Sequence, residues 1–181
     1  MNIQVNSLFR RVDAVEERWC LSLNRGCRLR AVRDFFTAVS RLGDGVLWYT
    51  LMGLMPLVNG RAGLMPAIRM ALAGLVGTVL YKYLKSRLVR ERPFISHCRI
   101  LQGTRALDRY SFPSGHTLHA VSFTILAVNA FPALAAVLVP FAILVAISRV
   151  VLGLHYPSDV IVGALVGGVL ATTTMVLVPL A

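Results

Sequence analysis

The sequence predicts an all-α fold: a polytopic bundle of about five transmembrane helices, preceded by an amphipathic segment at the membrane interface. Of the 181 residues, 56% are hydrophobic and only 15% are charged, and the mean hydropathy is +0.68. Soluble domains carry about 25% charged residues. Apolar segments of membrane-helix length also recur along the chain. We therefore expect one integral membrane domain over residues 1–181, with the amphipathic segment at 1–42 and the transmembrane core at 43–181.

The N-terminal segment alternates apolar and charged positions at helical spacing. Its apolar positions recur every three or four residues: Leu8, Val12, Val15, Trp19 and Leu23. Charged residues fill the positions between them, and such a segment prefers to lie along the membrane surface. A second amphipathic piece, residues 29–42, leads to a Gly43-Asp44-Gly45 break before the core.

The predicted transmembrane helices follow in order, at residues 46–58, 64–84, 116–131, 133–152 and 160–180. Arg69, near the start of the second helix, is expected to extend toward the lipid headgroups. Gly163, Gly167 and Gly168 predict a small-residue face for close helix packing in the last helix. With five crossings, the loop at 85–115, the turn at 148–159 and the N-terminal segment all emerge on one side.

The charge balance is strongly basic. Nineteen Lys and Arg residues face eight Asp and Glu residues, for a formal net charge of +11. In a soluble protein this would suggest nucleic acid. Here the basic residues gather at 10–41 and 82–109, outside the apolar segments, which favours lipid headgroups or a phosphorylated substrate over nucleic acid. The three cysteines, Cys20, Cys27 and Cys98, have no metal-type spacing and are an odd number, so they indicate neither a zinc site nor a disulfide framework.

Polar residues between the last two apolar segments form the first candidate site. Ser148, Arg149, His155 and Asp159 lie where polar side chains are costly. If residues 148–154 end one helix and Pro157 begins the next, Asp159 can hydrogen-bond one nitrogen of His155 and leave the other free as a nucleophile or base. The alternative is a histidine and an aspartate that only cap a helix hairpin.

Two further clusters belong to the same side. Lys85 and Arg92 are seven residues apart, two helical turns, and end at Pro93, so both cations can face one phosphate. A basic cluster that flanks a membrane helix is the alternative. In Pro113-Ser114-Gly115-His116, Ser114 is a good N-cap, Gly115 permits close approach of a ligand, and the first-turn N–H groups form an anion site beside His116.

Together these clusters resemble the signature of the type 2 phosphatidic acid phosphatase (PAP2) superfamily. The three parts occur in order, with every signature position filled: Lys85-x6-Arg92-Pro93, Pro113-Ser114-Gly115-His116 and Ser148-Arg149-x5-His155-x3-Asp159. The resemblance covers roughly residues 64–175. The superfamily includes lipid phosphate phosphatases, glucose-6-phosphatase, bacterial acid phosphatases and vanadium haloperoxidases.

The resemblance implies a role for each residue. His155 would attack phosphorus to form a phosphohistidine, with Asp159 orienting its ring. His116 would protonate the leaving oxygen and then activate water. The phosphate-binding residues would be Lys85, Arg92, Ser114, Gly115 and Arg149. Neither a metal ion nor another cofactor is expected.

The implied function is removal of a terminal phosphate from a membrane lipid. Candidate substrates by resemblance are phosphatidylglycerol phosphate, phosphatidic acid, polyprenyl phosphates or diphosphates, and phosphorylated lipid A. A non-catalytic lipid-phosphate-binding protein is one alternative. A vanadate-dependent haloperoxidase is another, although those relatives are larger and soluble.

The resemblance and the charge distribution favour different membrane sides for the site. Many relatives have six spans and an outward-facing site, whereas here the amphipathic segment replaces the expected first span. The catalytic side carries nearly all Lys and Arg residues, so the positive-inside rule places it in the cytoplasm. We expect a multi-pass protein of the bacterial inner membrane with a cytoplasm-facing site.

Other residues are expected to be structural. His119 should pack within the bundle. A solvated basic face is expected from Arg87, Arg90, Arg99, Arg105 and Arg109. Interfacial or lipid-facing anchors are expected at Trp48, Tyr49, Tyr81 and Tyr83.

Overall fold

The computed structural model describes residues 15–179, and over this range the chain is helical apart from loops and one isolated β-bridge between Glu91 and Tyr110. Positions 1–14, including Leu8 and Val12 of the predicted amphipathic segment, lie outside the described residues. A helix over residues 15–24 opens the described chain. The elements that follow are η1 (Arg25–Arg28), α2 (Arg30–Arg41), η2 (Leu42–Val46), α3 (Leu47–Asn59), α4 (Arg61–Arg87), α5 (Pro93–Ser96), α6 (Gly115–Ala130), η3 (Pro132–Leu134), α7 (Ala135–Val151) and α8 (Pro157–Leu177).

The all-α bundle is confirmed, and α3, α4, α6, α7 and α8 correspond to the five predicted helices. Among the described helices, three are long and apolar enough to cross a membrane: α4, the η3–α7 unit over Pro132–Val151, and α8. Helices α3 and α6, with 13 and 16 residues, are shorter. The number of crossings therefore stays a prediction.

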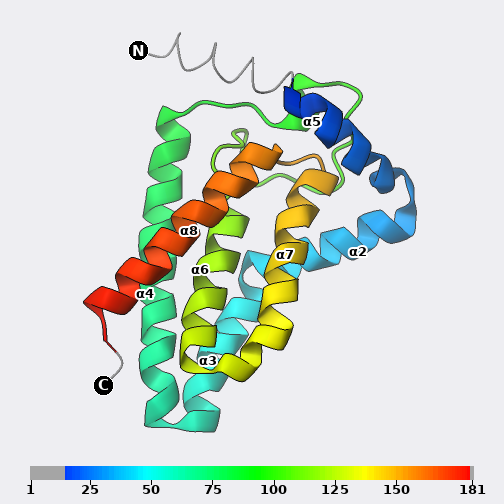
Figure 1. Cartoon of the computed structure of the whole chain (residues 1–181). Helices are drawn as coiled ribbons and strands as arrows, with labels where there is room; N and C mark the ends of the chain where they lie inside the picture. The colour runs from blue at the N-terminus through cyan, green and yellow to red at the C-terminus, as the bar shows by residue number, and fades with distance from the viewer. Residues whose placement is uncertain (1–14, 180–181) are drawn as a thin grey trace.

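Helix α6 stands at the centre of the bundle and packs against α4, α7 and α8 (Figure 1). Helix α3 packs beside α4, while α2 runs across the bundle and contacts α7. Trp48 of α3 is 1% exposed, packs on Phe123 of α6 and donates its Nε1–H to the Gly43 carbonyl oxygen at 3.1 Å. The prediction of an interfacial Trp48 was wrong because this carbonyl satisfies its indole N–H inside the core.

Arg69 was also predicted wrongly, because it does not extend toward headgroups. It is 3% exposed, and its guanidinium donates to the Val178 and Met175 carbonyl oxygens at the end of α8 and to Asn129 Oδ1. A cation at a helix C-terminus satisfies carbonyl groups that lack intrahelical partners. Arg69 thus joins α4 to the ends of α8 and α6.

Two of the three glycines in α8 allow it to approach α6. A Cβ added to Gly163 would lie 2.6 Å from the Ser114 carbonyl oxygen, and one added to Gly167 would lie 2.4 Å from the Leu118 carbonyl oxygen. Gly168 has no neighbour within 4 Å, so its predicted place on the packing face was wrong. This close packing holds the start of α6 beside the start of α8, where the Ser114 N–H donates to the Asp159 carbonyl oxygen at 3.1 Å.

Gly167→Ala should therefore destabilise the protein, and Gly168→Ala should not. The new methyl group at 167 meets backbone of α6, and overpacking of this kind costs roughly 1–3 kcal/mol. At 168 the methyl group meets open space, and alanine favours the helix. Thermal unfolding of both variants in detergent measures the difference. Equal unfolding temperatures for the two variants would contradict this packing.

Candidate active site

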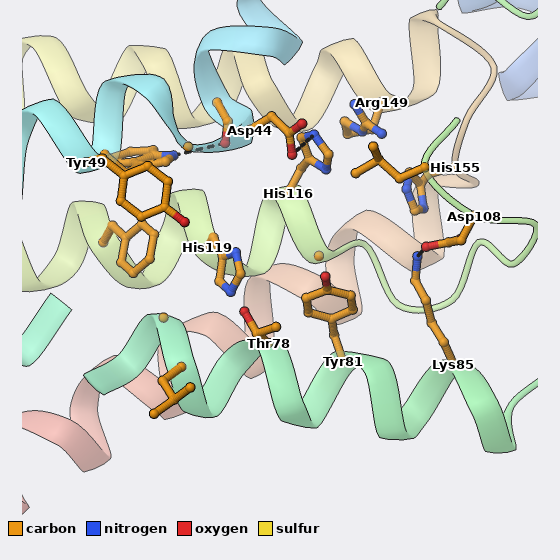
Figure 2. Close-up of a pocket in the computed structure, with 18 of the residues that line it drawn as sticks. Asp44, Tyr49, Thr78, Tyr81, Lys85, Asp108, His116, His119, Arg149 and His155 are labelled. Carbon is orange, nitrogen blue, oxygen red and sulfur yellow. Dashed lines mark hydrogen bonds and ion pairs between the residues drawn. The ribbon is translucent and has the colours of Figure 1, made fainter. Parts of the chain in front are cut away.

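The three signature clusters meet at one end of the bundle, around a cavity of about 430 Å³ (Figure 2). The wall of the cavity includes the end of α4, the start of α6, the end of α7 and the turn between α7 and α8. Its polar end is lined by Asp44, Lys85, Arg92, Asp108, Gly115, His116, Arg149 and His155. Ser114 and Asp159, both fully buried, lie behind this lining.

His155 lies in the turn between α7 and α8. Helix α7 ends at Val151, earlier than predicted, because Gly153 takes a left-handed φ of 72° that turns the chain back. His155 is 1% exposed, and its ring has Nε2 3.2 Å from Arg92 Nη1 and Nδ1 3.6 Å from Asp159 Oδ2. Because a guanidinium can only donate, Nε2 is the acceptor and the ring proton belongs on Nδ1, toward Asp159.

The surroundings of His155 favour its neutral form. Burial first, and then the nearby guanidinium groups of Arg92 and Arg149, hold the pKa of His155 well below its ordinary value. A neutral imidazole with its Nε2 lone pair on the side of the cavity is the form that attacks an electrophile.

Asp159 is held rigidly at the start of α8. Its Oδ2 accepts the Tyr156 N–H at 2.8 Å, and its Oδ1 accepts from Arg90 Nη1 at 2.6 Å. The 3.6 Å gap to His155 Nδ1 is longer than a hydrogen bond. Catalytic pairs are often this loose without a substrate and tighten when one binds.

Lys85 and Arg92 converge, although not along one helix as predicted. Helix α4 ends at Arg87, and Arg92 takes an extended backbone (φ −74°, ψ 151°), as expected before Pro93. Lys85 Nζ and Arg92 Nη2 each lie 2.8 Å from one carboxylate oxygen of Asp108. Both cations therefore reach the two oxygens of a single anion.

Asp108 was missed by the sequence analysis because it lies in the basic loop, outside every motif. Burial alone would raise the pKa of Asp108, but Lys85 and Arg92 hold that pKa below its ordinary value. Its carboxylate stays ionised and bridges the two cations with its two oxygens.

His116 and Arg149 complete the polar end of the cavity. His116 Nε2 lies 3.2 Å from Oδ1 of Asp44, a second missed carboxylate that the Gly43-Asp44-Gly45 break carries into the cavity. Gly45 has a φ of 134°, so this turn requires glycine. Arg149 is 3% exposed and donates to Ser40 Oγ, while its Nε has no hydrogen-bond partner within residues 15–179.

Ser114 is the N-cap of α6, as predicted, and the contact of its hydroxyl with a phosphate stays a prediction. Its Oγ lies 2.9 Å from Thr117 Oγ1 and accepts the Thr117 N–H at 3.4 Å, so it caps α6. Gly115, the first residue of α6, lines the cavity. The N-terminus of α6 that Ser114 caps is therefore next to the cavity.

Other predictions need correction. Arg90 is 2% exposed and lies in a buried ion-pair network, whereas Arg87, Arg99, Arg105 and Arg109 are exposed as expected. Tyr81 lines the cavity instead of anchoring the surface. His119 packs in the bundle as predicted, stacked on Phe123, and also lines the cavity.

Comparison with known proteins identifies the family. The sequence profile of the PAP2 superfamily matches residues 64–181, which is more than half of the chain. This chain belongs to the PAP2 superfamily. The match ends at the last residue of the sequence and includes all three signature clusters.

Curated relatives are bacterial phosphatases. Lipid A 1-phosphatase of Rhizobium etli is 28% identical over 163 residues, which cover 78% of this chain and 69% of that protein. Decaprenylphosphoryl-5-phosphoribose phosphatase of Mycolicibacterium smegmatis is 40% identical over 76 residues, covering 41% of this chain and 39% of that protein.

Solved structures share the fold. The crystal structure of Aquifex aeolicus LpxE has a TM-score of 0.76 at 26% identity, covering 87% of this chain and 93% of that one. The PAP2-type phosphatidylglycerolphosphate phosphatase of Bacillus subtilis has a TM-score of 0.74 at 23% identity, covering 92% and 86%. Together with the apolar helices, the family match and these relatives show that this chain is a membrane lipid phosphatase of the PAP2 type.

The neutral state of His155 can be tested directly. Because its pKa lies well below the ordinary value of 6.5, the ring should be mostly unprotonated at pH 6.5, where an ordinary histidine is half protonated. Titration of the histidine-ring resonances in labelled protein, with the His155 signal assigned by its loss in His155→Ala, measures this. A titration midpoint at 6.5 or above would contradict the structure.

Proposed function

We propose that this PAP2 protein removes a terminal phosphate from a membrane lipid through a phosphohistidine on His155. The observation that carries the proposal is the position of His155. Its neutral ring turns Nε2 toward the cations of the cavity and Nδ1 toward Asp159. This geometry supports nucleophilic attack by Nε2 with the developing positive charge balanced at Nδ1.

In the first step the phosphate is held by Lys85, Arg92, Arg149 and the N–H groups at the start of α6. His155 Nε2 forms a bond to phosphorus while the bond between phosphorus and the lipid oxygen breaks. His116, which also lines the cavity, gives its proton to the departing oxygen.

In the second step His116 removes a proton from water, and the water oxygen attacks phosphorus. The phosphorus–nitrogen bond breaks, inorganic phosphate leaves, and His155 returns to its neutral form. All of these proton and phosphoryl transfers use groups of this chain, so we expect the reaction to need no metal ion or cofactor.

The lipid part of the substrate fits the other end of the cavity. Away from the cations the lining becomes apolar, with Trp48, Met52, Leu75 and Phe123 from α3, α4 and α6. An acyl or prenyl chain beside the phosphate would bury against these residues. The candidates remain phosphatidylglycerol phosphate, phosphatidic acid, polyprenyl phosphates or diphosphates, and phosphorylated lipid A. The names of the relatives support a lipid phosphate as the substrate, but they do not select one of these lipids.

Purified protein in detergent with excess chelator should release phosphate from at least one of these lipids. His155→Ala should abolish turnover because it removes the nucleophile. His97→Ala is the matched control, since His97 lies in the loop and does not line the cavity. No release from any lipid by folded protein would favour the lipid-phosphate-binding alternative.

We also propose that α3, α4, α6, α7 and α8 all cross the bacterial inner membrane, with the N-terminal helix and α2 at its surface. Charge supports a cytoplasmic position for the catalytic end. The opposite end carries only two basic residues within the described chain, Arg61 and Arg69, and Arg69 is buried. The positive-inside rule then places the catalytic end in the cytoplasm.

Cys98 offers a direct test of this orientation. It is exposed in the loop at the catalytic end, whereas Cys20 and Cys27 are buried. A membrane-impermeant maleimide should label Cys98 only after spheroplasts are permeabilised, and Cys98→Ser should show no labelling. Rapid labelling of Cys98 in intact spheroplasts would place the site on the outer face and overturn the proposal.

A further inference from the structure

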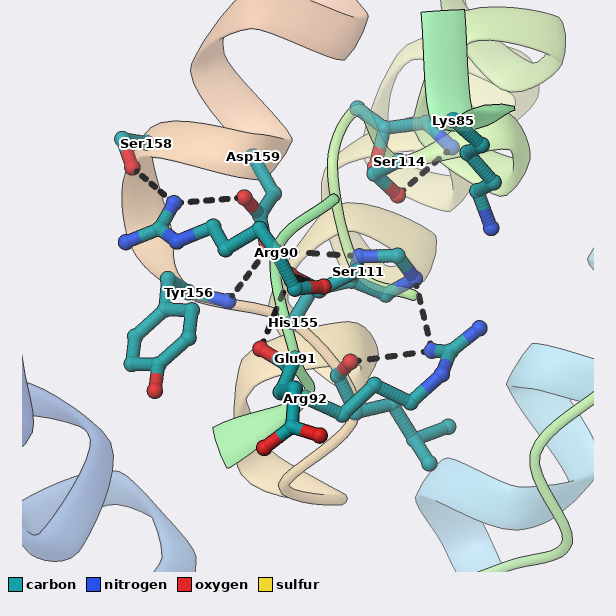
Figure 3. A network of polar contacts seen from close by, with 12 residues as sticks. Lys85, Arg90, Glu91, Arg92, Ser111, Ser114, His155, Tyr156, Ser158 and Asp159 are labelled. Atoms are coloured by element: carbon teal, nitrogen blue, oxygen red, sulfur yellow. Dashed lines mark hydrogen bonds and ion pairs between the residues drawn. The ribbon is translucent and has the colours of Figure 1, made fainter. Parts of the chain in front are cut away.

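A buried polar network lies behind the catalytic pair, and Arg90 is at its centre (Figure 3). Arg90 Nη1 donates to Asp159 Oδ1 at 2.6 Å and to Ser158 Oγ at 2.7 Å, while Nη2 donates to Glu16 Oε2 at 2.7 Å. Its guanidinium also stacks over the Tyr156 ring, 3.9 Å from the ring centroid. Arg90 is not one of the signature residues. It nevertheless directly contacts Asp159, the aspartate that faces His155.

Glu16 brings the N-terminal helix into this network. Its Oε1 accepts the Ser158 N–H at 2.6 Å, and its Oε2 accepts from Ser158 Oγ at 2.7 Å as well as from Arg90. A carboxylate at a helix N-terminus is stabilised by the free N–H groups and the helix dipole. Glu16 therefore caps α8 from a residue 142 positions earlier in the chain.

The N-terminal helix has one buried stripe of residues and one exposed stripe. Glu16, Cys20 and Asn24 form a stripe at four-residue spacing that is 9%, 0% and 3% exposed. The adjacent stripe, Val15, Trp19 and Leu23, is 68%, 66% and 43% exposed. Asn24 extends the inner contacts by donating to the Leu101 and Val151 carbonyl oxygens. The polar stripe is thus the one fixed to the catalytic end.

The charges explain what Arg90 does. It is one buried cation between two carboxylates, those of Glu16 and Asp159. With Oδ1 of Asp159 held by Arg90, Oδ2 is the oxygen left for the Tyr156 N–H and for His155 Nδ1. Removing one partner of a buried ion pair leaves an uncompensated charge. Without Arg90, Asp159 would lose the contact that holds its Oδ1 and its buried counter-charge, and only the Tyr156 N–H would still hold Oδ2.

We propose that Arg90, anchored by Glu16 of the N-terminal helix, is a positioning residue that holds Asp159 against the catalytic His155. The inference rests on the proposed roles of His155 and Asp159 in phosphoryl transfer. Arg90 does not line the cavity, so its loss should slow the chemical step without weakening substrate binding. The N-terminal helix then becomes a structural part of the active site.

Steady-state kinetics of Arg90→Gln in detergent, on a lipid that the wild type hydrolyses, tests the proposal. We expect kcat to fall about 10- to 100-fold with KM within about twofold of wild type. Arg90→Lys, which keeps the charge, should recover part of kcat. Glu16→Gln should lower kcat in the same direction, because it weakens the anchor of Arg90.

Two matched controls are available beside these positions. Arg87→Gln changes an exposed arginine three residues before Arg90, and Glu17→Gln changes a carboxylate whose partner, Arg99, is exposed. Both should keep wild-type kcat. Thermal unfolding of every variant separates a loss of folding from a loss of positioning, and Arg90→Lys and Glu16→Gln keep the proposal testable if Arg90→Gln does not fold.

A double-mutant cycle decides between positioning and general stabilisation. If Arg90 acts through Asp159, Arg90→Gln should lower the residual kcat of Asp159→Asn by less than about twofold. Full additivity, a rise in KM alone, or a wild-type kcat in folded Arg90→Gln would overturn the inference while leaving the proposed function intact. Wild-type turnover by both His155→Ala and Asp159→Asn would instead overturn the proposed site itself, and the inference with it.

Discussion

Charge buried at the end of an apolar helix bundle is the constraint on which the rest of this site depends. Lys85, Arg90, Arg92 and Arg149 are all less than one tenth exposed, and a buried charge is tolerated only with partners. The partners come from separate elements: Asp108 of the loop for Lys85 and Arg92, Asp159 of α8 and Glu16 of the N-terminal helix for Arg90, and Ser40 of α2 for Arg149. Asp44, from the turn before α3, pairs with His116. Cations are in excess in the cavity, and carboxylates are in excess behind it. The neutral His155 lies between the two, so a phosphate in front and an imidazolium charge at Nδ1 would both meet their complement.

Helix packing sets the positions of the groups that surround His155. Gly163 and Gly167 bring α8 onto α6, which holds Gly115 and His116 beside the turn that carries His155. The extended backbone before Pro93 turns Arg92 toward His155, although Arg92 lies beyond the end of α4. Groups placed by rigid elements need little reorganisation during the reaction, and this is where electrostatic stabilisation is most effective.

The helices and the signature residues could be predicted from the sequence because both signals are local. Long apolar segments predict the helices, and each signature motif occupies a short stretch of the chain. Partners that lie far apart along the chain could not be predicted in this way. Asp108 meets Lys85 from 23 positions away, and Glu16 meets Arg90 from 74. Periodicity likewise gave no sign that Trp48 and Arg69 would find hydrogen-bond acceptors inside the bundle, so both were assigned to the interface. The roles of the signature residues in catalysis stay predictions, as does the number of membrane crossings.

The most direct test of this account is to identify the phosphorylated residue during turnover. Rapid quenching of wild-type protein with a radiolabelled lipid phosphate, followed by peptide mapping under alkaline conditions that preserve phosphohistidine, locates the label. The account predicts phosphate on Nε2 of His155, since that nitrogen faces Arg92 while Nδ1 faces Asp159. Phosphate on another side chain, or on Nδ1 of His155, would contradict it.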